Sequence, residues 1–342
     1  MSAPAPLAPA PRRRSTRTGR IATLAVACVA ALAAIHYTVR SGSYLAAARP
    51  VPALLPDIAS TESVGRSGEL RVQLAHPGDT VPYPLALHAD TGAVAYEWVR
   101  AADAQVAAPL RPLDGTSLVA PTSPGFFHLV LVRGEARQVL SDIAVAVLVP
   151  FEAKEDGRIN GYQIGTYLAE RLGARYQRPE GFLEVRPEDL TLQLTRHFRV
   201  ADFVTRDGQE TWPRYVALEP RLLDKLELVL AKVEEVAGLD SVGKDLSVRV
   251  NAGFRTPAYN RTVPGSAKNS QHQYGDAADL AIDANADGRV DRADTRLVAL
   301  AVNEVERENP DLAGGLGLYT SRKWTRPFVH IDARGRRARW TQ

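Results

Sequence analysis

The sequence has little sulfur, with one cysteine and one methionine among its 342 residues. A single cysteine excludes an intramolecular disulfide and a metal cluster held by several thiolates. That cysteine, Cys28, lies inside an apolar run, so the rest of the chain has no thiol that could be oxidised. This composition suits an oxidising compartment, and it leaves imidazole and carboxylate as the ligands for any zinc site.

Acidic residues are absent before Asp57, whereas five arginines precede residue 21. The formal net charge of +3 depends on these arginines, because the remainder of the chain is close to neutral without them. The sequence therefore does not indicate a basic nucleic-acid-binding surface on a folded domain. The arginines of this cluster are Arg12, Arg13, Arg14, Arg17 and Arg20.

An apolar run without charge begins at Ile21, and residues compatible with a membrane continue to Val39. A segment of about 20 such residues can span a bilayer, and an arginine-rich flank stays in the cytoplasm. The sequence therefore predicts a basic cytoplasmic tail over residues 1–20, a transmembrane signal anchor over 21–39 and a periplasmic location for the rest. The alternative is a secreted protein, because the Leu-Ala-Ala-Ala segment at 45–48 offers a small-residue site for signal-peptide cleavage.

The first part of the exported region divides by composition into three segments. Residues 40–68 are rich in Ala, Pro and Ser and lack periodicity, which indicates a linker. Residues 69–150 contain about seven short β runs between Pro and Gly turns, which predicts an immunoglobulin-like β-sandwich with Trp98 in its core. No catalytic set is visible there, so a spacer or positioning role is expected, with carbohydrate or protein binding as the alternative. Residues 151–194 are interpreted as an ordered connector.

Residues 195–342 combine helix and strand patterns, which predicts an α+β domain. Pro220 opens a helix whose leucines recur at helical spacing, and Gly238 ends it. The segment from Leu246 to Val250 alternates and is predicted to be a strand. The apolar stripe of the helix is expected to be core and not a binding surface.

A histidine and carboxylate set in this domain has the composition of a catalytic zinc site. His272 and Asp279 are seven residues apart with Gly275 between them, so a turn followed by a strand can bring both side chains to one ion. His330 lies in a short β run, where alternation points it to the same face as Asp332. Three protein ligands leave a fourth position open for water. Asp332 can then orient a ligand or act as a base on that water.

These segments resemble the M15 zinc peptidases, which include D-Ala-D-Ala carboxypeptidases and murein endopeptidases. The resemblance rests on the SQHQYGDAAD sequence at 270–279 and on the later FVHIDARG run, and it covers roughly residues 195–342. It implies His272, Asp279 and His330 as zinc ligands. It also implies that Arg255 meets a substrate carboxylate or a developing oxyanion, for which its fork of donors is suited.

The sequence departs from this family at the position of the general base. Many members place a glutamate or histidine two or three residues before the last ligand, but Phe328 and Pro327 occupy those positions here. Neither side chain can transfer a proton. Asp332 is therefore the predicted base.

Residues 283–294 have the spacing of an EF-hand-type calcium loop, with Gly288 at the sharp turn. An aspartate at the last position resembles dockerin calcium loops. The predicted ligands are Asp283, Asn285, Asp287, the Arg289 carbonyl, Asp291 and Asp294. Calcium bound there would stiffen the zinc site. The alternative is an acidic turn in which Asp291 or Asp294 caps the helix that follows.

The predicted function is zinc-dependent hydrolysis of peptide bonds in peptidoglycan, by endopeptidase cleavage of cross-links or by D,D-carboxypeptidase trimming of peptide stems. Placement on the outer side of the cytoplasmic membrane fits a cell-wall substrate. One alternative is a non-catalytic protein that binds the wall or a partner and keeps a structural metal. A calcium-regulated adhesion module is a third possibility, supported only by the predicted sandwich and the acidic loop.

Overall fold

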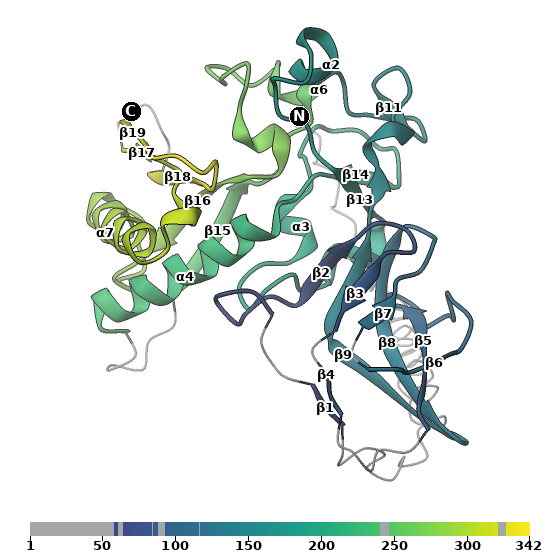
Figure 1. The fold of residues 1–342 in the computed structure, drawn as a ribbon. Coiled ribbons are helices and arrows are strands. Elements are labelled where there is room, and N and C mark those ends of the chain that lie inside the picture. The colour runs from purple at the N-terminus through teal and green to yellow at the C-terminus, as the bar shows by residue number, and fades with distance from the viewer. Residues whose placement is uncertain are drawn as a thin grey trace, which may run out of the picture. The chain divides into compact units, whose positions relative to one another are not determined.

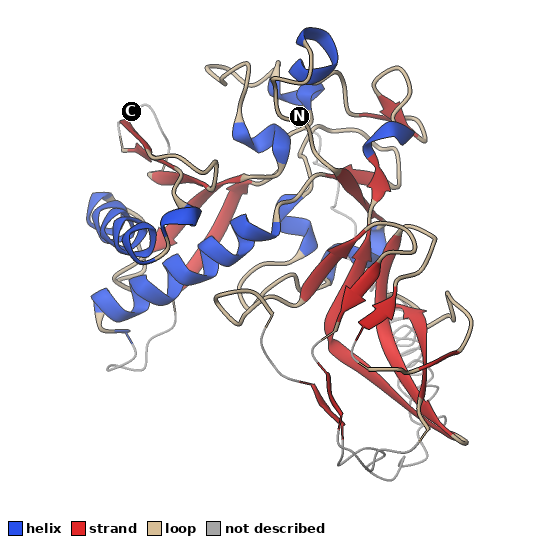
Figure 2. Ribbon diagram, in the orientation of Figure 1, coloured by secondary structure: helices blue, strands red, loops and turns tan. Residues whose placement is uncertain are grey.

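The fold of the chain was analysed in a computed structural model, which describes residues 58–60, 64–83, 85–87, 93–115, 117–239, 246–320 and 326–342. It is a mixed α/β structure (Figures 1 and 2). Within these ranges, no helix has both the length and the apolar character needed to cross a membrane. The predicted anchor at 21–39 lies outside the described residues.

The region predicted to be all-β consists of strands in separate sheets. Five strands form a sheet in the order β2-β9-β8-β5-β6, and β3 pairs with β7 in a second, smaller sheet, while β1 pairs with β4. Trp98 on β5 is 1% exposed and donates a hydrogen bond to the carbonyl of Val119 on β7, which joins the two sheets. Trp98 is thus a core residue, as predicted. The strands are β1 (Ile58–Ser60), β2 (Val72–Ala75), β3 (Thr80–Pro82), β4 (Leu85–Leu87), β5 (Ala95–Arg100), β6 (Arg111–Pro112), β7 (Ser117–Val119), β8 (Gly125–Arg133) and β9 (Ala136–Val147).

The segment predicted to be a connector is ordered and packs into a large core that it shares with the residues on both sides. Tyr162, Tyr167 and Phe182 are buried in the same cluster as the leucines of helix α4. Its elements and those up to residue 216 are β10 (Val149–Pro150), η1 (Phe151–Ala153), β11 (Arg158–Ile159), β12 (Tyr162–Gln163), α2 (Leu168–Leu172), β13 (Gly181–Val185), η2 (Pro187–Thr191), α3 (Val200–Phe203) and β14 (Arg214–Val216).

The C-terminal region places two long helices against one five-stranded sheet with the order β15-β16-β18-β17-β19 (Figure 1). The predicted helix is found as α4, and Gly238 caps it in the left-handed region, with φ +66°. The predicted strand is found as β15. The elements are α4 (Pro220–Ala237), β15 (Ser247–Ala252), α6 (Pro257–Asn260), η3 (Gln271–Tyr274), β16 (Ala277–Asp283), α7 (Arg292–Glu308), η4 (Pro310–Leu312), β17 (Gly315–Tyr319), β18 (Phe328–Asp332) and β19 (Ala338–Thr341).

Strand alternation gives the central strands of this sheet two different faces. On β16 and β18, Leu280 and Ile331 belong to the core cluster formed with α4 and α7. Asp279 and His330 point to the other face, and the antiparallel register pairs them directly. The sheet therefore presents polar side chains at its centre on the face away from the helices.

Candidate metal centre

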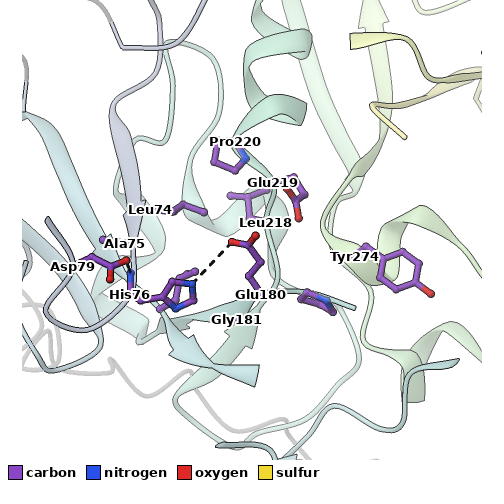
Figure 3. Close-up of a pocket in the computed structure, with 12 residues that line it drawn as sticks. Leu74, Ala75, His76, Asp79, Glu180, Gly181, Leu218, Glu219, Pro220 and Tyr274 are labelled. Atoms are coloured by element: carbon purple, nitrogen blue, oxygen red, sulfur yellow. Dashed lines mark hydrogen bonds and ion pairs between the residues drawn. The ribbon is translucent and has the colours of Figure 1, made fainter. Parts of the chain in front are cut away.

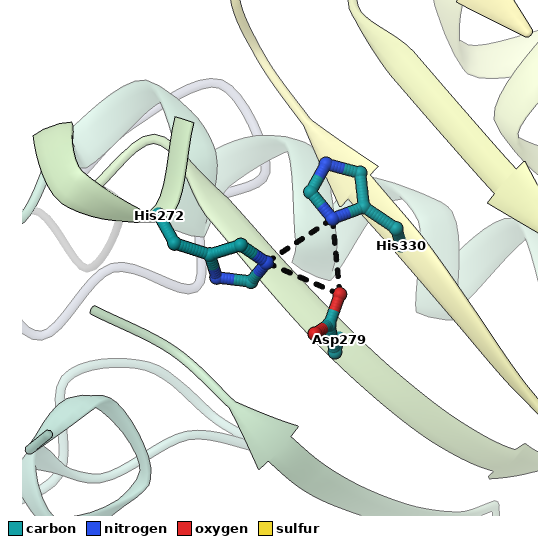
Figure 4. A group of neighbouring side chains, drawn as sticks. All are labelled: His272, Asp279 and His330. Atoms are coloured by element: carbon teal, nitrogen blue, oxygen red, sulfur yellow. Dashed lines mark hydrogen bonds and ion pairs between the residues drawn. The ribbon is translucent and has the colours of Figure 1, made fainter. Parts of the chain in front are cut away.

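Three side chains from three different elements meet on that face (Figure 4). His272 comes from η3, Asp279 from β16 and His330 from β18. His272 Nε2 lies 3.2 Å from Asp279 Oδ1 and 3.2 Å from His330 Nδ1, and His330 Nδ1 lies 3.0 Å from Asp279 Oδ1. Within the described ranges this is the one group of at least three such residues that could hold a metal ion. All three are predicted ligands, and the structure brings them together.

Gly275 makes the approach of His272 to β16 possible. It ends η3 in the left-handed region with φ +70°, a conformation that glycine adopts without strain. A Cβ at this position would lie 2.2 Å from the carbonyl oxygen of Ala217. The turn that the sequence predicts between the two ligands is therefore present, and only glycine fits in it.

The outer hydrogen bonds of the two histidines point their lone pairs into the group. His272 Nδ1 lies 2.7 Å from the Gly253 carbonyl oxygen, which can only accept, so this nitrogen carries the proton. His330 Nε2 lies 3.0 Å from a carboxylate oxygen of Asp332 and donates to it in the same way. When both rings are neutral, the remaining nitrogens face Asp279 as lone-pair donors. Their separations of 3.0–3.2 Å approach the roughly 3.3 Å between ligands of tetrahedral zinc, so the residues fit this ion.

Burial and charge shape the titration of this group. Burial lowers the pKa of His272, despite the neighbouring Asp279. Burial alone would raise the pKa of Asp279, but the two histidines hold it well below its usual range. Burial would lower the pKa of His330, but hydrogen bonds to Asp279 and Asp332 raise it above its usual value. The carboxylate is thus kept ionised, as a metal ligand must be.

Arg255 lies at the site and contacts the carboxylate of Asp279, and its role toward a substrate stays a prediction. Its guanidinium is hydrogen-bonded to Asp279 Oδ2, while Oδ1 of the same carboxylate faces the two histidines. The Arg255 backbone N–H also donates to the carbonyl of His272, at 3.0 Å. The arginine side chain is 15% exposed, so part of its donor fork remains accessible.

Asp332 is fully buried, and donors surround its carboxylate. Its Oδ2 accepts from His330, and its Oδ1 accepts from the backbone N–H of Gly315 at 2.7 Å and from Arg334 Nε at 2.8 Å. Burial would raise the pKa of Asp332, but His330 and Arg334 hold it far below its usual range. Of the two roles considered for Asp332, this geometry favours orientation of His330 over proton transfer.

Two residues at the site are not identified by the sequence reasoning. The Trp340 ring centroid lies 5.2 Å from that of His330, and a Cβ at Gly317 would lie 2.4 Å from the Trp340 ring, so this glycine lets the indole lie close against β17. Arg334 is part of the FVHIDARG run, but the sequence analysis assigns it no function. Its position two residues after Asp332 was the only indication in the sequence that it contacts this carboxylate.

In the acidic loop at 283–294, carboxylate side chains accept hydrogen bonds from backbone N–H groups of the same segment. Asp283 Oδ2 accepts from the N–H of Gly288 at 2.8 Å, and Asp294 Oδ1 accepts from the N–H of Ala284 at 2.8 Å. Asp291 caps α7 by accepting from Ala293 N–H at 2.6 Å. The helix-capping alternative is therefore realised in the structure. Calcium binding by this loop stays a prediction.

A separate cavity of about 300 Å³ lies beside the start of α4 (Figure 3). His76, Glu180 and Glu219 line it, and His76 Nε2 lies 4.0 Å from Glu180 Oε2. The cavity reaches η3 at Tyr274, but none of the three candidate metal ligands lines it.

The mixed α/β fold thus carries, on one face of a sheet, a buried His-Asp-His group that could hold a metal ion. Residues 197–302 match the family model described as Peptidase M15. This match supports an M15 family peptidase domain in the C-terminal region, and peptidases of this family are zinc-dependent. The matched segment includes His272 and Asp279 and ends before His330. No curated protein and no solved structure matches the chain.

Proposed function

We propose that this chain is a zinc-dependent peptidase that hydrolyses peptide bonds of peptidoglycan outside the cytoplasm. One observation carries the zinc assignment: two imidazole nitrogens, which are acceptors when the rings are neutral, and one carboxylate oxygen lie 3.0–3.2 Å from one another in a buried site. Such an arrangement of acceptors is repulsive without a cation or a shared proton between them. The family match supports peptidase activity in general.

The side chains around the centre have separable roles in this proposal. When bound, zinc would polarise the scissile carbonyl and lower the pKa of its water. Arg255 holds Asp279 by one oxygen, and its accessible donors suit a substrate carboxylate or a developing oxyanion. Asp332 fixes the tautomer and ring orientation of His330. Trp340 forms an aromatic wall beside His330.

The proposed substrate and location rest on the sequence. The predicted signal anchor over residues 21–39 would hold the peptidase domain on the outer side of the cytoplasmic membrane, next to the cell wall. Peptide stems and cross-links of peptidoglycan are peptide substrates within reach in that compartment. In this proposal the β-rich region before residue 151 is an immunoglobulin-like spacer that positions the peptidase domain. Both endopeptidase and D,D-carboxypeptidase cleavage are compatible with the site.

A second candidate function is wall or partner binding with a structural metal. The observation that favours it is the shortage of a free proton acceptor: Pro327 and Phe328 stand where many M15 members have one, and both oxygens of Asp332 are engaged. A protein of this kind would bind peptidoglycan without cutting it.

Digestion of purified peptidoglycan separates the two candidates. The zinc-loaded full chain in detergent would be incubated with sacculi, and the released fragments analysed by mass spectrometry, with His272→Ala as the matched control. Peptide-bond cleavage by the wild type alone supports the peptidase. Zinc binding and sedimentation with sacculi, without cleavage, would favour the binding protein.

A further inference from the structure

A buried ion pair lies behind the metal centre, on the helix side of the sheet. Lys225 of α4 and Glu306 of α7 are 0% and 1% exposed, and Lys225 Nζ lies 2.9 Å from Glu306 Oε1. Removing two charges from water is costly, and a buried pair often stabilises a fold no better than apolar residues of similar size. The contacts of this pair indicate a role beyond joining two helices.

Lys225 holds the main chain of Asp332, and Glu306 holds the neighbouring segment that donates to the Asp332 carboxylate. Lys225 Nζ donates to the carbonyl oxygen of Asp332 at 2.7 Å. Glu306 Oε1 accepts from the backbone N–H of Gly314 at 3.0 Å. The next N–H along the chain, that of Gly315, donates to Asp332 Oδ1 at 2.7 Å. The ion pair therefore fixes both the main chain of Asp332 and a donor to its carboxylate.

The two glycines show how closely these groups fit together. A Cβ on Gly314 would lie 1.8 Å from the Asp332 carbonyl oxygen and 2.9 Å from Lys225 Nζ. A Cβ on Gly315 would lie 2.2 Å from Asp332 Oδ2. Backbone without side chains is needed here for the carboxylate and the ammonium to reach their partners.

Two arginines complete the network from the outside. Arg339 Nη2 lies 2.6 Å and Arg337 Nε 3.1 Å from Glu306 Oε2, and both arginine side chains are partly exposed. Each oxygen of Glu306 therefore has a cationic partner, and the network connects strand β19 with the two helices.

We infer that Lys225 and Glu306 are positioning residues for the metal centre, acting through Asp332 on the orientation of His330. The contacts run from Lys225 to the Asp332 main chain, and from the Asp332 carboxylate to His330 Nε2, which leaves Nδ1 directed at His272 and Asp279. This inference rests on the proposed zinc site. It concerns ligand orientation, so it predicts an effect on metal affinity.

The test measures zinc affinity of the full chain by competition with a chelator, together with the Co²⁺ absorption spectrum. Lys225→Met is expected to weaken zinc binding by about 10–100-fold, the usual effect of losing an outer partner of a ligand. Both substitutions act through the same contact, that of Asp332 with His330. The double variant Lys225→Met with Asp332→Asn should therefore bind zinc about as well as Asp332→Asn alone. The matched control is Glu227→Gln, a buried carboxylate on α4 whose partners are Thr195 and His197, and it should leave zinc affinity unchanged.

Several outcomes would overturn the inference and leave the function standing. These are unchanged zinc affinity and an unchanged Co²⁺ spectrum in a folded Lys225→Met protein, or losses that add in the double variant. If Lys225→Met does not fold, Glu306→Gln, which keeps an acceptor for Gly314 N–H, is expected to weaken zinc binding, and unchanged affinity would again overturn the inference. A wild-type chain that binds no zinc would instead overturn the proposed function.

Discussion

At the scale of single residues, Asp332 has two alternative roles in the centre, orientation of His330 or proton transfer. If it orients His330, Asp332→Asn should lower zinc affinity by about 10–100-fold, and cleavage should recover in excess zinc. If it takes the proton, as the sequence alone predicts, cleavage should fall by about 100-fold or more at full zinc occupancy. The buried carboxylate with its three donors favours the first result. Zinc content and turnover, measured side by side against His272→Ala, separate the two.

Asp276 gives the centre a neighbour that responds to pH. Burial raises its pKa to about 7, against the opposing effect of Arg221, while Asp332 and Glu219 add to the rise. Its Oδ2 contacts Arg221 Nη2 at 3.1 Å, and its Oδ1 has no hydrogen-bond partner in the described part of the chain. The folded state binds this proton more strongly than the unfolded chain does, so protonation of Asp276 stabilises the fold. This stabilisation is fully present below about pH 4 and is lost as the pH rises through about 7.

Asp276→Asn should therefore change the pH dependence of stability. The variant should gain on the wild type as the pH rises from 5 to 8, by up to about 3 kcal/mol in the free energy of unfolding, because about two pH units below the raised pKa fall in this interval. Urea unfolding at both pH values measures this difference, in which the titration of the metal ligands, common to both proteins, largely cancels. A constant difference between variant and wild type would contradict the raised pKa.

The turn at Gly275, the strand alternation at His330 and the exclusion of thiolates could be predicted from the sequence, because each is local or compositional. The ligand set as a whole was implied by the resemblance to the M15 peptidases, because the pairing of His330 with Asp279 joins strands that are distant in sequence. The roles of Trp340 and Lys225 could not be predicted, because they depend on which strand or helix lies across the sheet. Lys225 lies on the buried face of a helix that the leucine stripe identifies as core. The only indication of a role for Lys225 in the sequence was its position on this leucine-rich helix face.

At the scale of elements, the segment predicted to be a connector supports the site. The carbonyl of Ile164 accepts from the backbone N–H of Ala258 at 2.9 Å, in the short helix that follows Arg255. A Cβ on Gly165 would lie 2.7 Å from that same nitrogen, so the two backbones are in close contact. The ring of Tyr167 lies against that of Tyr274 in η3, with centroids 5.9 Å apart. Periodicity carries no sign of these contacts, because they join irregular segments distant in sequence.

The acidic loop gives a prediction at the same scale. If calcium binds residues 283–294, the carboxylates must turn from backbone N–H groups to the ion, and added calcium should raise the melting temperature of the wild type. Asp283→Ala combined with Asp287→Ala should remove this shift and leave zinc stoichiometry intact. If the melting temperature of the wild type does not change when calcium is added, the loop is only the helix-capping turn seen in the structure.

At the scale of the whole molecule, the β-rich region and the peptidase domain share a core. Phe126 on β8 and Ala146 on β9 belong to the same buried cluster as Phe182 and Leu222. Length and composition predict separate folding units along the chain, but they do not show how much apolar surface one unit buries against the next. A spacer packed in this way would move with the peptidase domain.

The full chain is expected to have a defined topology in the membrane. The arginines before residue 21 and the apolar run at 21–39 are expected to keep the N-terminus in the cytoplasm and the peptidase domain outside. Protease added to intact spheroplasts should then digest the C-terminal domain while a cytoplasmic marker stays whole. Replacing the five arginines by glutamine should weaken this orientation, because the flanking positive charge sets it. Complete protection of the wild-type domain would show that it faces the cytoplasm, where a peptidoglycan substrate is out of reach.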